Sequence, residues 1–191
     1  PIFGSKKGRD SDIMYQRDGK EGLECWVLPV NGRSVGDLFS NNGVRIFSRN
    51  VRGYMGTNSN VNRGIANTLA NSPHMFMHFN NGVTILCDDA NTCDLKKGTG
   101  INIQHPQIIN GQQTTRSLAA SDNSAKATVL VKIIKLARNL DKDKHYFHNV
   151  IGNIVKATNS QTPVTPSDLG SNDSRQLAVD KALRTEDFIY L

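Results

Sequence analysis

The segment at residues 110–116, Asn-Gly-Gln-Gln-Thr-Thr-Arg, gathers polar side chains between a short apolar run and a helical pattern. Gly111 lets the backbone approach a ligand closely, and a helix start offers free N–H groups and a partial positive charge to an anion. Arg116 adds a cation one helical turn later. The other candidates, which carry hydrogen-bonding groups, are Asn110, Gln112, Gln113, Thr114 and Thr115. The segment predicts a phosphate-binding turn; the alternative is a polar first turn that satisfies only its own helix end.

Asparagine is unusually frequent, at 20 of 191 residues, and it clusters beside glycine and other amides. Asn80 and Asn81 precede a glycine, and Asn159 and Gln161 flank a serine. Such clusters are typical of turns, because Asn and Gly tolerate positive φ. Uncharged amides can also line a ligand pocket with donors and acceptors. Both interpretations remain open for each cluster.

Composition excludes several classes of protein. The net charge of +6 comes from scattered Lys and Arg, which permits nucleic acid as a partner without requiring it. No stretch reaches the roughly 20 apolar residues of a membrane span, so no membrane association is expected. The first residues contain no signal peptide, and three scattered cysteines give no disulfide framework, so we expect a cytoplasmic protein. His74 and His78 have no evident third ligand, and no metal site is predicted.

The elements that must position these residues alternate along the chain. Hydrophobic periodicity and turn residues predict strands at residues 23–30, 44–47, 83–88, 107–109 and 128–136. The same signals predict helices at residues 35–39, 61–71, 112–121, 144–158 and 173–184. This interleaving favours an α+β fold, a mixed sheet with packed helices, in which residues 129–136 are central. Residues 1–21 read as a flexible segment and residues 22–191 as one domain. Because the chain starts at Pro1, we expect a fragment of a longer protein.

Four ordered segments resemble the AIPR family, whose name records abortive infection and phage resistance. They are RIFSRNVRGYMGTNSNVNRGIANTL (45–69), FNNGVTILCDD (79–89), PQIINGQQTTRSL (106–118) and ATNSQTPVTPSDLGSND (157–173), called below the first to fourth family segments. The third segment is also similar to the DGQHR-type motif of restriction-related proteins. More distantly, the third and fourth resemble the ParB and sulfiredoxin-like fold, which implies a nucleotide-binding mixed sheet with packed helices.

The resemblance implies roles for particular residues. Gly111 and Gln112 match the DGQHR-type motif, and Asn159 matches the asparagine of a ParB segment that holds nucleotide phosphates. Asn50 and Arg52 stand where ParB-like proteins place polar and basic residues on the ligand. Together with the residues above, these positions would form one pocket, which Gln161 helps to close.

The resemblance implies a phage-defence domain that binds a nucleotide or a nucleic-acid phosphate and acts as a sensor. One alternative is an NTPase or an NTP-dependent nuclease module, which needs a nucleoside triphosphate with Mg²⁺ as cofactor. The other is a ligand-free scaffold for protein interaction. Other regions of a longer chain, or partner proteins of a defence system, are the expected macromolecular partners.

Overall fold

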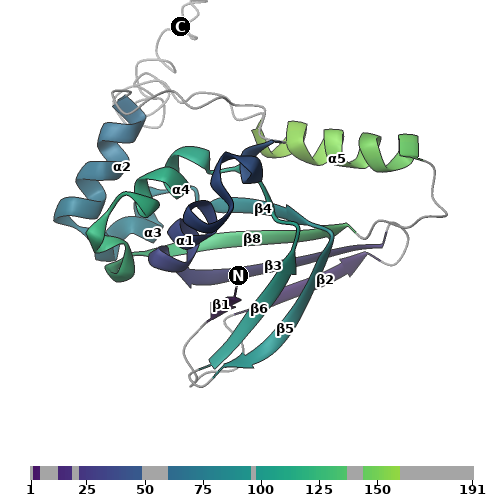
Figure 1. The fold of residues 1–191 in the computed structure, drawn as a ribbon, viewed down its shortest axis with the longest axis horizontal. Coiled ribbons are helices and arrows are strands. Elements are labelled where there is room, and N and C mark those ends of the chain that lie inside the picture. The colour runs from purple at the N-terminus through teal and green to yellow at the C-terminus, as the bar shows by residue number, and fades with distance from the viewer. Residues whose placement is uncertain are drawn as a thin grey trace, which may run out of the picture. The chain divides into compact units, whose positions relative to one another are not determined.

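The computed structural model describes residues 2–4, 13–18, 22–48, 60–95, 98–136 and 144–159, all within one compact unit (Figure 1). The strands are β1 (Ile2–Gly4), β2 (Met14–Asp18), β3 (Leu23–Asn31), β4 (Val83–Cys87), β5 (Asp89–Leu95), β6 (Gly98–Gln104), β7 (Gln107–Asn110) and β8 (Thr128–Leu136). The α-helices are α1 (Gly32–Asn42), α2 (Asn60–Asn71), α3 (Phe76–Phe79), α4 (Gln112–Ala119) and α5 (Lys144–Asn159). Short 3-10 helices are η1 (Gly43–Phe47), η2 (Pro73–Met75) and η3 (Asp122–Lys126).

The main sheet has five strands in the order β2-β3-β8-β4-β7, so β8 is central, as the sequence predicts. β3 and β8 pair antiparallel along their whole length, from Leu23 opposite Leu136 to Asn31 opposite Thr128. β4 runs parallel to β8, which makes the sheet mixed. The predicted α+β class is therefore confirmed.

Side chains on the two faces of β8 belong to two different apolar clusters. Val129, Val131 and Ile133 are almost completely buried with side chains of α1, α2, α3 and α4. On the other side of the strand, Ile134 and Leu136 pack with residues of α5. This arrangement follows from the two-residue period of a strand, which sends successive side chains to opposite faces. The helices predicted at residues 112–121 and 144–158 thus contribute to different clusters.

The apolar spacing within residues 144–158 predicts that Val150, Ile151 and Ile154 on α5 are buried, and the structure confirms this in part. Ile151 is buried, whereas Val150 and Ile154 are half-buried at the edge of the same cluster. No helix among the described residues is both long and apolar enough to cross a membrane.

A second sheet, with strand order β1-β6-β5, was missed by the sequence analysis. β5 and β6 form a hairpin with pairing from Asp89 opposite Gln104 to Leu95 opposite Gly98. Its sequence is rich in Asn, Asp, Gly and Thr, a composition that turns share. The hairpin sequence has low intrinsic β-propensity. It is stabilised instead by burial of Ala90, Ile101 and Ile103 in the main core.

Two further expectations were wrong. Residues 1–21 are not uniformly loop, because β1 pairs with β6 and β2 pairs with β3. Residues 44–47 form part of the 3-10 helix η1 instead of a strand. Ile46 and Phe47 are consecutive and both buried, an arrangement that a one-sided strand would not give. The helix predicted at residues 173–184 lies outside the described residues.

A small polar network links the two sheets. Lys135 on β8 contacts Glu24 on β3 at 3.1 Å and Asp89 on β5 at 2.9 Å. The Tyr15 hydroxyl donates a hydrogen bond to Glu24, which is the main reason that the pKa of Glu24 is lowered. Hydrogen bonding to Lys135 lowers the pKa of Asp89. The pKa of Lys135 is raised, mainly by its hydrogen bond to Asp89 and to a smaller extent by its hydrogen bond to Glu24.

Replacing Lys135, which contacts both carboxylates, should lower the free energy of unfolding by an amount that depends on pH. Lys135→Met should lower the free energy of unfolding at pH 7 by about 1–2 kcal/mol, because the two carboxylates lose a half-buried partner. Lowered carboxyl pKa values stabilise the fold above about pH 5, and this contribution is lost as pH falls through the folded-state values. Urea denaturation at pH 7 and pH 3 should therefore show a smaller difference between variant and wild type at pH 3.

Lys132→Met is the matched control, because Lys132 lies on the same strand and is exposed. It should change stability by less than about 0.5 kcal/mol at either pH. An equal loss from both substitutions would show that the network contributes nothing specific.

Candidate functional site

The turn between β7 and α4 is built on a direct contact between two backbones. Gly111 has φ +95°, in the left-handed region, and a Cβ there would lie 2.8 Å from the Gly82 carbonyl oxygen and 3.0 Å from Val83 Cα. Gly82 also has positive φ, +78°, and a Cβ there would collide with the Leu130 carbonyl oxygen. The second and third family segments therefore meet at two glycines. Of the two reasons expected for a glycine at position 111, positive φ or close approach of a ligand, the structure shows positive φ, and the group that approaches Gly111 is protein backbone.

The first turn of α4 is largely turned inward. The Thr115 backbone N–H and hydroxyl both donate to the Gly111 carbonyl, each at 2.9 Å. Thr115 and Thr114 are buried, as is Leu118 in the main core. On its other side α4 packs against α1, where a Cβ on Gly36 would lie 2.9 Å from the Ala119 nitrogen. Thr114 is therefore enclosed within the fold beside the turn.

Asn110 ties the same turn to the end of α5. Its amide nitrogen donates to the Thr158 carbonyl oxygen at 2.6 Å. Thr158 belongs to the fourth family segment, and Asn159 is the last residue of α5. The amide predicted to bind a ligand thus has a structural partner, and that partner brings the third and fourth segments together.

The remaining predicted amides differ in their surroundings. Asn80 donates to the Phe76 carbonyl at 3.2 Å, closing the end of α3, whereas Asn81 is exposed. Gln112 and Gln113 are half-buried, and Gln113 Oε1 is enclosed without a hydrogen-bond partner among the described residues. Asn50, Arg52 and Gln161, and the side chain of Asn159, lie outside the described part of the structure.

Arg116 is held by aromatic rings. Its guanidinium carbon lies 4.8 Å from the ring centre of Phe39 on α1 and 5.2 Å from that of Phe47 in η1. The two rings are themselves 5.5 Å apart. Cation–π attraction at such distances helps to fix the position of a guanidinium. Phe47 lies in the first family segment, so this contact joins the first and third segments.

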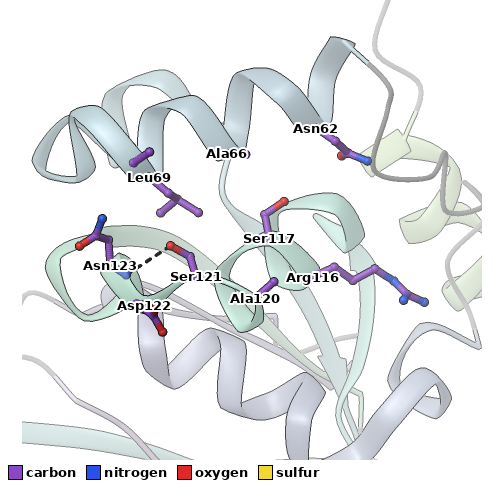
Figure 2. A pocket seen from close by; sticks show the side chains of 10 residues that line it. Asn62, Ala66, Leu69, Arg116, Ser117, Ala120, Ser121, Asp122 and Asn123 are labelled. Atoms are coloured by element: carbon purple, nitrogen blue, oxygen red, sulfur yellow. Dashed lines mark hydrogen bonds between the residues drawn. The ribbon is translucent and has the colours of Figure 1, made fainter.

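A cavity of about 420 Å³ lies between α2 and the C-terminal part of α4. Its apolar lining consists of Ala66, Leu69, Ala70 and Ala120, and its polar lining of Asn62, Arg116, Ser117, Ser121, Asp122 and Asn123. Figure 2 shows Asn62 and Arg116 at one end of the cavity and Ser121 and Asn123 at the other. Asn62 is only 5% exposed. The cavity is of the size that small-molecule ligands occupy.

Sequence reasoning missed most of this cavity. Asn62 carried a signal, as a polar residue in the first turn of a helix within a family segment. Ser117, in the lining, carried none, and neither did Phe39 and Phe47, which contact Arg116 outside the lining and depend on how α1, η1 and α4 pack. Within the described residues, no group of three His, Cys, Asp or Glu side chains could hold a metal ion.

The glycine contact gives a direct test of the turn. Gly111→Ala should lower the free energy of unfolding by about 2–4 kcal/mol, because it combines left-handed strain with a clash against Gly82 and Val83. Urea denaturation monitored by circular dichroism measures this loss.

Gly64→Ala is the matched control, since a Cβ at Gly64 in α2 meets nothing within 4 Å. It should stabilise the protein by about 0.5–1 kcal/mol through helix propensity. If Gly111→Ala proved as stable as wild type, the described contact between the two turns would be wrong.

Comparison with known proteins gives a family match that spans nearly all of the four family segments. The model of the AIPR family, described as AIPR protein, matches residues 47–191, about three quarters of the chain. No curated protein and no solved structure matches this chain. The expected similarity to ParB-like proteins therefore remains a prediction.

Proposed function

Because this chain belongs to the AIPR family, which points to a role in phage defence, we propose that it binds a phosphate group beside the β7–α4 turn. The phosphate would belong to a nucleotide or a nucleic acid. Binding, rather than a chemical step, is the proposed activity of these residues.

The observation that carries the proposal is the convergence of all four family segments on residues 110–116. Phe47 of the first segment contacts Arg116, and Gly82 of the second abuts Gly111. Thr158 of the fourth accepts a hydrogen bond from Asn110. The four segments are spread over more than 100 residues of sequence. Their contacts at one turn therefore indicate that this turn is important for the structure or for the function.

The contacts divide the candidate residues into two groups. Asn80, Asn110 and Thr115 hydrogen-bond to backbone carbonyls, so we assign them to positioning the turn. Arg116 is the group proposed to meet the phosphate, because it is cationic, held in place and lines a cavity. Charge-assisted hydrogen bonds from such a group are about twice as strong as neutral ones. Free N–H groups at the start of α4 and the Gln112 amide would add donors.

Residues outside the described ranges complete the proposal. Asn50 and Arg52 follow closely after Ser48, whose hydroxyl donates to Gln107 Oε1 on β7 at 2.5 Å. This contact holds η1 next to the strand that leads into the turn. Asn159 and Gln161 follow directly after Thr158 in sequence. We propose, on the family resemblance, that these four residues contribute to the same phosphate site.

A ligand-free scaffold is the second candidate function. The internal hydrogen bonds of Asn80 and Asn110 favour it, because turn-forming amides explain part of the family segments without any ligand. The two candidates differ in what Arg116 does. A scaffold needs Arg116 for packing on Phe39 and Phe47, whereas a phosphate site also needs its charge.

Removing the charge of Arg116 separates these functions. Arg116→Gln should weaken nucleotide or oligonucleotide binding about tenfold to a hundredfold, or about 1.5–3 kcal/mol, through loss of a charge-assisted contact. Isothermal titration with nucleoside triphosphates, with and without Mg²⁺, and with a short single-stranded oligonucleotide measures the affinity independently of stability.

Arg45→Gln makes the same change of charge at an exposed position in η1 and should leave affinity within about threefold of wild type. If neither class of ligand binds the wild type, or if both variants bind as tightly as wild type, the phosphate site is wrong and the scaffold remains.

A further inference from the structure

The cavity between α2 and α4, called the slot below, has apolar residues from both sides in its lining. Ala66, Leu69 and Ala70 follow one another at helical spacing on α2, and Ala120 follows the last residue of α4. The alanines among them are small and leave room for a ligand beside the backbone. Apolar walls favour a ligand part with uncharged faces, because their burial removes apolar surface from water.

The two ends of the slot differ in charge. Arg116 lies at one end beside Asn62, whereas Asp122 lies at the other beside Ser121 (Figure 2). An anionic group would therefore be attracted to the Arg116 end and repelled from the Asp122 end, which orients a ligand along the slot. Ser121 and Asn123 offer hydroxyl and amide groups, which both donate and accept hydrogen bonds.

We propose that this slot binds a free mononucleotide, with its phosphate at Arg116 and its base between the alanine-lined walls. A nucleobase has apolar faces and a polar edge, and proteins hold isolated bases between apolar side chains while hydrogen-bonding that edge. The edge would face Ser121 and Asn123. This inference rests on the proposed phosphate site at Arg116 and specifies the class of ligand, a small molecule rather than a strand.

Ala66→Leu tests the slot without touching Arg116. The larger side chain would occupy the wall, so affinity for nucleoside 5′-monophosphates should fall about tenfold or more. Gly64→Leu is the matched control, because it adds the same side chain two residues earlier on α2 in open space. It should bind within about twofold of wild type. Isothermal titration with each of the four monophosphates provides the measurement.

A second variant guards against misfolding of the first. Ser117→Ala removes a hydroxyl from the slot with little change in volume and should also weaken monophosphate binding, by about threefold to tenfold. Retention of wild-type affinity by both Ala66→Leu and Ser117→Ala would overturn the proposed slot.

The ligand panel separates failure of the slot from failure of the phosphate site. A wild type that binds an oligonucleotide or inorganic phosphate through Arg116, but no monophosphate, would overturn the slot and leave the phosphate site. Binding of no phosphate compound would overturn both. Monophosphate binding that is weakened by both Arg116→Gln and Ala66→Leu, and unchanged by Gly64→Leu, is the expected result.

Discussion

The contact between Gly111 and the Gly82–Val83 backbone is the constraint on which the candidate site depends. Both glycines have positive φ, and a Cβ on Gly111 would collide with the Gly82–Val83 backbone, whereas a Cβ on Gly82 would collide with the Leu130 carbonyl. The contact joins the end of β7 to the start of β4 and so determines where α4 begins. Because α4 is only two turns long and packs on α1, its start also determines where Arg116 meets Phe39 and Phe47. The position of Arg116 against the two rings thus depends on the backbone contact at the glycines.

Charge and hydrogen bonding are distributed unequally around this turn. Asn80, Asn110 and Thr115, close to the two glycines, each donate a hydrogen bond to a main-chain carbonyl, which holds them in structural roles. The guanidinium of Arg116 lies over the rings of Phe39 and Phe47. A half-buried cation acts through a lower effective dielectric than one in water, so its attraction for an anion is stronger. A modest net charge is therefore compatible with selective anion binding at one place.

Sequence predicted those parts of the fold whose signals are local. The alternation of β8 and the apolar stripe of α5 gave correct elements, because burial follows periodicity when one face meets the core. Gly111, in the third family segment, was expected to have positive φ or to lie close to a ligand, and the structure shows the positive φ. The β5–β6 hairpin was missed because its polar sequence is stabilised by three buried residues contacting a core assembled from other elements.

The site was less predictable than the fold. A sequence shows that Asn110 can donate a hydrogen bond, but not that Thr158, 48 residues away, is its acceptor. Likewise, nothing local links Arg116 to two phenylalanines in separate elements, or α2 to the far end of α4. Residue types indicate the chemistry available, whereas the division between positioning and binding depends on tertiary contacts that no short segment encodes.

The register of the central sheet has a consequence for how the chain folds. β3 is synthesised about 100 residues before β8, with which it pairs along its whole length, so this pairing must wait for the intervening chain. The β4–β8 pairing must wait as well, since it is parallel and spans η3 and α4. Such non-local pairing slows folding, because loop-closure entropy is lost before contacts form. Both pairings of the central strand β8 are therefore non-local and can form only after the whole of β8 has been synthesised.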